Sequence, residues 1–137
     1  MLKKSLQCLT LFLLCIGISY AAGPSPAGMW QTVVDGKPYS IVKITVSNGV
    51  LQGRVVKQFV DCTDCTAEWR NTPKKGMAIV YGLREKNGVW EGGYVLDPNT
   101  GKPYRCEITI SADGRTLHVR GFVGISLLGK TADWQRV

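Results

Sequence analysis

The sequence has little of what enzymes use, since it contains one histidine, His118, and none of the short motifs that accompany common catalytic mechanisms. There is no Gly-x-Ser-x-Gly nucleophile turn, no His-Glu-x-x-His metal helix and no glycine-rich phosphate loop. No window of a dozen residues has a helical hydrophobic period, although 66–71 can form a single turn. These absences argue against an enzyme of familiar mechanism and against a helical fold.

The polar side chains that remain are weak candidates for catalysis. His118 lies on the polar face of an expected strand, and no nucleophile motif accompanies it. Asp97 and Asp113 lie in turn sequences, where Asp shapes the backbone through its own hydrogen bonds. We therefore expect no enzymatic activity and no cofactor.

The first residues have the pattern of a secretory signal peptide. Lys3 and Lys4 form a positive start, an apolar run follows over 6–18, and 19–21 place the small residues Ser19 and Ala21 where a signal peptidase reads them. The apolar run is too short to span a bilayer, and no later segment is long enough to do so. We predict that residues 1–21 are removed and that the protein is periplasmic or secreted.

The formal charge of the whole chain is +7, and removal of the two signal-peptide lysines leaves +5 on the mature chain. Basic residues beside a long loop, with Trp69 as a stacking platform, would resemble a site for single-stranded nucleic acid. These residues are Lys57, Arg70, Lys74 and Lys75. Export argues against nucleic acid as a partner, and an anionic headgroup or a cell-envelope polymer fits the charge better.

Tight-turn sequences divide the rest of the chain at short intervals. Asn48-Gly49, Asn87-Gly88 and Asp113-Gly114 are typical of β-hairpins, because their turns need residues that accept positive φ. The segments between the turns are rich in Val, Ile, Tyr and Trp, and several alternate apolar with polar residues. Eight strands are predicted, near 29–35, 39–47, 51–60, 77–86, 89–97, 104–111, 117–124 and 130–137.

Eight short antiparallel strands joined in chain order can form either a sandwich or an up-and-down barrel. Closure removes exposed sheet edges, and glycines within the strands permit the curvature that a barrel needs. We therefore predict an all-β fold, with one eight-stranded barrel over 28–137 after a flexible lead-in at 22–27. Its hairpins are short except for one longer loop near 61–76, and loops of that length are often functional.

Three cysteines follow the signal peptide: Cys62, Cys65 and Cys106. A disulfide is the default in an oxidising compartment. A bond from Cys106 to Cys62 or Cys65 would tie the long loop to the sixth strand, whereas Cys62–Cys65 would close a small, strained ring. The Cys-x-x-Cys spacing also suits metal or redox chemistry. However, few further ligands remain for a zinc site, and a thioredoxin-type motif requires a helix that this chain lacks, so we expect no metal centre.

The aromatic residues indicate where a ligand could lie. Strand alternation places Trp90, Tyr94 and Leu96 on one face of their strand, and it turns Tyr81 and Tyr104 toward the apolar face of theirs. Such side chains can line an apolar pocket with a few polar groups, as small-molecule sites do. They can equally fill a solid core, because an eight-stranded barrel allows both.

Several segments resemble a known family. Gly28-Met29-Trp30 and Arg136 resemble the Gly-x-Trp start and terminal Arg of lipocalin-like barrels, in which the Arg packs over the Trp and closes one end. Longer segments resemble the secreted bacterial family catalogued as domain of unknown function 2147, and they lie at 76–83, 90–104, 119–124 and 128–131. The resemblance covers nearly all of 28–137. It implies an exported, eight-stranded lipocalin-like barrel and no particular reaction.

Together these patterns predict a non-enzymatic binding protein that takes one small, partly apolar or amphipathic molecule in the barrel. Tyr81, Trp90 and Tyr104 are the candidate apolar walls of the site. Lys102 and Arg120 are candidate polar or anionic handles, although alternation places Arg120 outside. The alternative is a structural or protein-interaction module of the cell envelope, with a solid barrel core and an envelope protein as its partner.

Overall fold

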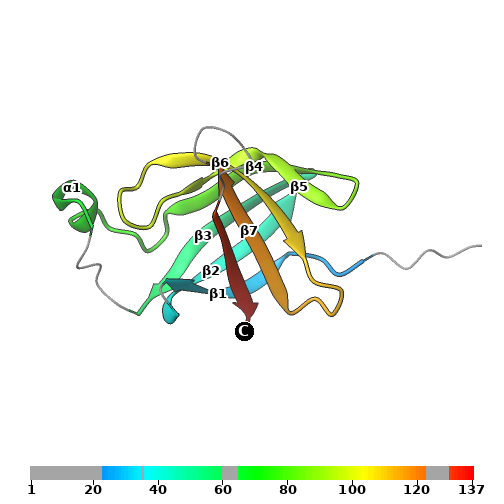
Figure 1. Ribbon diagram of the computed structural model, residues 1–137, viewed down its shortest axis with the longest axis horizontal. Helices are drawn as coiled ribbons and strands as arrows, with labels where there is room; N and C mark the ends of the chain where they lie inside the picture. Colours follow the sequence, from blue (N-terminus) through cyan, green and yellow to red (C-terminus); the bar gives the residue numbers. More distant parts are fainter. Residues whose placement is uncertain (1–22, 35, 60–64, 123–129) are drawn as a thin grey trace, which may run out of the picture.

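Eight strands close into a barrel in which each strand pairs with the next in the chain and the last pairs with the first (Figure 1). The computed structural model describes residues 23–34, 36–59, 65–122 and 130–137. All eight pairings are antiparallel. The strands are β1 Gly28–Val34, β2 Lys37–Ser47, β3 Val50–Gln58, β4 Ala78–Lys86, β5 Val89–Leu96, β6 Pro103–Ile110, β7 Thr116–Phe122 and β8 Lys130–Arg136. The prediction of a barrel, with its strand number and order, is therefore confirmed.

The hairpins form where their turn sequences predict them. Both central residues of the β2–β3 turn have positive φ, 53° at Asn48 and 77° at Gly49. The β4–β5 turn repeats this geometry, with 54° at Asn87 and 83° at Gly88. Such turns match the twist of the paired strands, and for this reason asparagine and glycine occupy them.

One short helix interrupts the all-β pattern. It is α1, Ala67–Arg70, and Figure 1 places it beyond one end of the barrel. The side chain of Thr66 caps it by accepting a hydrogen bond from the backbone N–H of Trp69. In the described part of the chain, no helix is long and apolar enough to cross a membrane.

The predicted alternation of β5 is wrong, because the strand contains a bulge. Between Trp90 and Gly93 the register against β6 shifts by one residue, and Gly92 there has a φ of 86°. After the shift Trp90 and Gly93 are both buried, whereas Tyr94 is exposed. Trp90 and Tyr94 therefore lie on opposite faces of the sheet, not on the same face.

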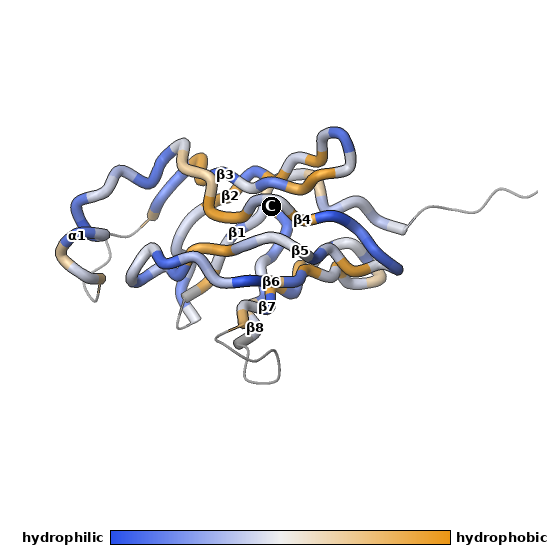
Figure 2. The backbone as a smooth tube through the Cα atoms, turned by 90° about the horizontal axis from the view of Figure 1, so that it is seen from above, coloured by the Kyte–Doolittle hydropathy of each residue, from blue (hydrophilic) through white to orange (hydrophobic). Residues whose placement is uncertain are grey.

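The main core fills one end of the barrel, where the odd-numbered strands begin and the even-numbered strands end. Figure 2 shows apolar stretches of the backbone, in orange, distributed among hydrophilic ones, in blue, over the strands. The largest fully buried side chains of this core are Trp30, Ile44, Leu51, Leu83, Ile108 and Leu117. Their burial closes this end of the barrel to solvent.

Arg136 seals the closed end, as its resemblance to the lipocalin-like pattern implies. Its guanidinium carbon lies 4.3 Å from the centre of the Trp30 ring, a cation–π contact. The same guanidinium donates hydrogen bonds to the backbone carbonyls of Gly114, Ala27 and Ser25. Two of these acceptors belong to the lead-in, so residues 25–27 are held against the barrel.

Candidate functional site

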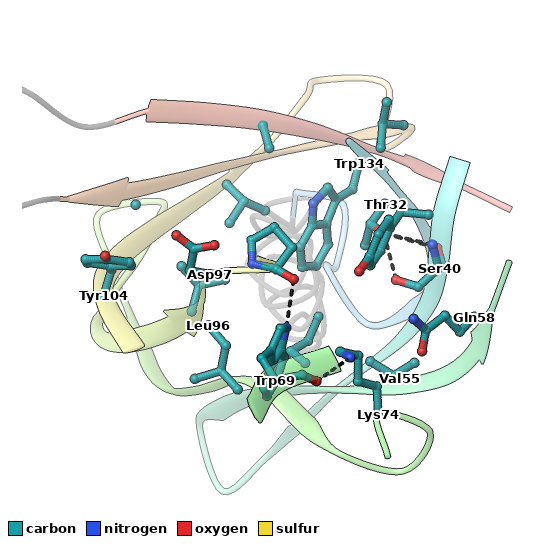
Figure 3. Close-up of a pocket in the computed structure, with 18 residues that line it drawn as sticks. Thr32, Ser40, Val55, Gln58, Trp69, Lys74, Leu96, Asp97, Tyr104 and Trp134 are labelled. Atoms are coloured by element: carbon teal, nitrogen blue, oxygen red, sulfur yellow. Dashed lines mark hydrogen bonds between the residues drawn. The ribbon is translucent and has the colours of Figure 1, made fainter. Parts of the chain in front are cut away.

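A cavity of about 270 Å³ lies at the end of the barrel opposite Arg136 (Figure 3). It is formed where the odd-numbered strands end and the even-numbered strands begin, so every strand contributes at least one residue. Its lining includes Thr32, Ser40, Gln58, Trp69, Lys74, Ile79, Val95, Asp97, Tyr104, Val119, Gly121, Ala132 and Trp134. Antiparallel pairing thus gives the barrel one packed end and one hollow end.

The wall formed by β4, β5, β7 and β8 is apolar. Val95, Val119 and Ala132 face the cavity from three of these strands, and Trp134 adds an indole ring. Gly121 is also part of the wall, and a Cβ added to it would meet only the Val95 side chain, at 3.5 Å. Part of the hollow space therefore exists because β7 carries no side chain at position 121.

The segment that begins at Cys65 and contains α1 covers the hollow end. Trp69 is buried and its indole N–H donates to the carbonyl of Pro98 at 2.7 Å. A second bond joins the backbone N–H of Thr66 to the carbonyl of Asn99 at 3.0 Å. Gly101 has a φ of 75°, and any side chain there would overlap the Trp69 ring. These three contacts hold the cover against the β5–β6 turn.

Lys74 supports Trp69 from the other side. Its side chain is only 9% exposed, and its ammonium donates to the carbonyl of Trp69 at 2.9 Å. The same ammonium lies 4.7 Å from the centre of the Trp69 ring. Arg70, another member of the predicted basic cluster, donates to the carbonyl of Cys65 at 2.8 Å. Both cations stabilise the cover, and Lys74 is buried, whereas Arg70 stays exposed.

Of the predicted ligand-binding residues, only Tyr104 lines this cavity. Tyr81 is 36% exposed and packs on the outside against Tyr94, with ring centres 5.7 Å apart. The left-handed Gly82 and the β5 bulge interrupt simple alternation here, and the expectation that Tyr81 faces the interior is corrected. Trp90 is inside, but it packs in the core at the closed end.

The two predicted handles also lie outside the cavity. Lys102 is exposed in the turn before β6. Arg120 is on the outer face of β7, 3.8 Å from a carboxylate oxygen of Glu107 and over the ring of Phe122. Neither side chain is among those that line the hollow end. The polar groups that do line it include Thr32, Ser40 and Asp97.

Cys106 is a free, buried thiol at the centre of β6. The two predicted disulfides that use Cys106 are therefore wrong. Cys65 is buried under the cover, with its sulfur 3.2 Å from the carbonyl oxygen of Pro98. Cys62 lies outside the described residues, so a Cys62–Cys65 bond stays a prediction.

Burial, together with the smaller effect of the nearby Glu107 carboxylate, raises the pKa of the Cys106 thiol to about 12. An unfolded cysteine ionises near its ordinary pKa of 9.0. In the folded state Cys106 therefore keeps its thiol proton in a pH range where the unfolded state loses it. As pH rises from about 9 toward 12, this difference lowers the free energy of unfolding.

We predict that Cys106→Ala makes the alkaline loss of stability shallower. Urea unfolding of the wild type and the variant, compared between pH about 8 and about 10.5, measures the two slopes. Alkylation provides a second readout, because the native thiol is protonated and buried. Iodoacetamide should modify Cys106 only after unfolding. Equal slopes together with rapid labelling of the native protein would contradict this account.

Within the described ranges, no group of three or more His, Cys, Asp or Glu side chains is placed to hold a metal ion. His118 lies on the outer face of β7, where its Nδ1 is 2.7 Å from a carboxylate oxygen of Asp133 on the paired strand. Asp113 stabilises its turn, as predicted, because its carboxylate accepts hydrogen bonds from the Ser111 hydroxyl and the Arg115 backbone N–H. These polar residues have structural partners away from the hollow end.

Comparison with known proteins agrees with this architecture. A family model described as "Uncharacterized protein conserved in bacteria (DUF2147)" matches residues 28–136. Among solved structures, protein HP1028 from Helicobacter pylori, described as belonging to the lipocalin family, superposes with a TM-score of 0.64 at 21% sequence identity. The match covers 83% of this chain and 84% of that one. No curated protein matches the sequence significantly. The structural likeness confirms the lipocalin-like fold.

Proposed function

Because the chain belongs to the uncharacterized bacterial family DUF2147, which carries no assigned activity, we propose a function from the cavity itself. The protein binds one small, largely apolar molecule in the hollow end of the barrel. The observation that carries this proposal is a cavity of about 270 Å³ with an apolar wall, a few polar groups and an aromatic cover. This combination is typical of sites for small molecules.

The cavity volume sets the size of the ligand. An apolar protein cavity of roughly 150 Å³ holds benzene. By proportion, a cavity of about 270 Å³ accommodates about ten non-hydrogen atoms. This is the size of a two-ring aromatic molecule or a medium-length alkyl chain, and it is smaller than most drug-sized ligands.

The division of the barrel interior favours binding over a purely structural role. A solid core is present at the end that Trp30 and Arg136 close. The opposite end has the inward-facing valines and Trp134, yet the side chains there leave space unfilled. Since unfilled apolar space costs stability, a ligand that fills it gains dispersion contacts. The lipocalin-like fold supports the same function, and we propose a binding protein rather than an enzyme.

We further propose that the protein is exported and that residues 1–21 are removed. The intact mass of protein isolated from a periplasmic extract, measured with and without reductant, tests this. The proposal requires the mass of a chain that begins near residue 22. A shift of about two mass units on reduction would reveal a Cys62–Cys65 bond. A full-length mass in the periplasmic fraction would overturn the cleavage.

The binding function predicts that 2-naphthol, a two-ring probe of matching size, binds with one-to-one stoichiometry. If each of about ten buried non-hydrogen atoms contributes somewhat over 0.5 kcal/mol of binding free energy, we expect a dissociation constant on the order of 10–100 µM. Equilibrium dialysis measures the affinity directly. Calorimetry should give a negative heat-capacity change, because apolar surface is buried. The absence of saturable binding up to about 1 mM, well above that range, would refute the function.

A further inference from the structure

The cavity wall has a polar side as well as an apolar one. Thr32 on β1 lies opposite Ser40 on β2, and Ser40 lies opposite Gln58 on β3. All three residues line the cavity, and Figure 3 shows them following one another along one side of it. Val119 and Ala132 belong to the apolar wall formed by the later strands. A ligand in this space therefore meets the hydroxyls of Thr32 and Ser40 on one side and apolar side chains of the later strands on another.

The two hydroxyls are deeply buried and bonded to each other. Thr32 is 5% exposed and Ser40 is 4% exposed. Their side-chain oxygens lie 2.7 Å apart. The Thr32 hydroxyl also accepts from the backbone N–H of Ser40 at 3.1 Å and lies 3.3 Å from the Ser40 carbonyl, to which it can donate. Burying a polar atom among apolar groups costs free energy unless the atom forms hydrogen bonds.

The hydrogen-bonding capacity of the pair is not exhausted. Each hydroxyl has one proton to donate and two lone pairs to accept with. If Ser40 donates to Thr32, both lone pairs of the Ser40 oxygen stay available. If Thr32 donates to Ser40, one lone pair and the Ser40 proton stay available. In either arrangement Ser40 Oγ can accept a further hydrogen bond, and no other described residue supplies it.

We infer that Ser40 Oγ is the polar anchor of the ligand, and that the ligand class is a compact apolar molecule carrying one hydrogen-bond donor, such as a hydroxyl group. The inference rests on the binding function proposed above and specifies its ligand. The donor of the ligand meets Ser40, while its apolar body lies against Val95, Val119 and Trp134. A hydrocarbon of the same shape fits the cavity but leaves the Ser40 oxygen without this bond.

Ser40→Ala removes the anchor with little damage to the fold. Thr32 Oγ1 loses the Ser40 hydroxyl, but it still accepts from the backbone N–H at position 40 and can still donate to the carbonyl there, so no buried polar atom is left without a partner. Ser47→Ala is the matched control, because Ser47 is exposed at the far end of the same strand. Urea unfolding of both variants establishes that they are folded before binding is measured.

Two probes of equal shape test the inference: 2-naphthol, which has a hydroxyl, and naphthalene, which has none. Equilibrium dialysis gives dissociation constants for the wild type and for the two variants. Ser40→Ala should raise the dissociation constant of 2-naphthol about fivefold and change that of naphthalene less than twofold. Ser47→Ala should change neither. Each probe is judged by the ratio of its dissociation constants for variant and wild type. The hydration of the free probe is the same in both measurements and therefore cancels.

The outcomes separate this inference from the function on which it rests. If the wild type binds neither probe, the binding function fails and the anchor fails with it. If both probes bind, and Ser40→Ala weakens both equally or leaves both unchanged, the binding function stands and the Ser40 anchor is overturned. Selective weakening of 2-naphthol alone supports the anchor.

Discussion

Replacing Gly93 by alanine is expected to prevent the barrel from folding stably. A Cβ at this position would lie 2.6 Å from the carbonyl carbon of Gly82 and 2.8 Å from the backbone nitrogen of Leu83. These are backbone atoms of the neighbouring strand, so no rotation of a side chain can relieve the overlap. The strands would have to separate where β4 pairs with β5. We expect a loss of at least about 4 kcal/mol in the free energy of unfolding.

Gly121→Ala is the matched control for this variant. Gly121 is also a strand glycine without a positive φ, but its added Cβ would meet Val95 at 3.5 Å, an ordinary van der Waals distance. Since alanine also restricts the unfolded chain, its effect on stability should stay within about 1 kcal/mol of zero. Circular dichroism and urea unfolding compare the two proteins. Equal stability of Gly93→Ala and Gly121→Ala would refute the close approach of β4 and β5.

Much of the fold follows from local sequence. The Asn-Gly turns fix where hairpins form, because their positive φ values suit few other residues. Alternation in β6 and β7 correctly separates Cys106, Ile108, Leu117 and Val119 from their solvent-facing neighbours. The failure lies in β5, where Gly92 inserts one extra residue. Glycine in a strand marks a bulge only in general terms, because the pairing partner decides its position.

The candidate site is harder to predict, because it is formed between strands that are distant in the sequence. The prediction of Tyr104 is correct because this residue is in phase with Cys106 on a strand of regular alternation. Ser40 is likewise in phase with the buried Val42 and Ile44, and this is a signal that it faces the interior. Tyr81 is predicted instead because it is aromatic, although it lies outside the barrel. The cover over the cavity depends on Trp69 meeting the carbonyl of Pro98, a contact that the sequence pattern does not encode.

Gly121→Leu should weaken ligand binding strongly while leaving the barrel at least as stable. The leucine side chain would point into the cavity from β7, beside Val95, and take much of the space of about 270 Å³ that the ligand needs. We expect the dissociation constant for 2-naphthol to rise at least tenfold, a loss of about 1.4 kcal/mol or more. Filling an apolar cavity commonly adds about 0.5–2 kcal/mol of stability. Binding and stability should therefore change in opposite directions.

That opposition is what distinguishes a hollow barrel from a filled one. In a packed interior the same leucine would be too large and would cost about 1–3 kcal/mol of stability. Thr131→Leu is the matched control, since Thr131 is exposed on the strand that pairs with β7, and its leucine would face solvent. Dialysis with 2-naphthol and urea unfolding give both quantities for each variant. If Gly121→Leu is destabilised and still binds the probe, the ligand lies elsewhere. If it is stable and no longer binds, while Thr131→Leu binds normally, the hollow end of the barrel is the binding site.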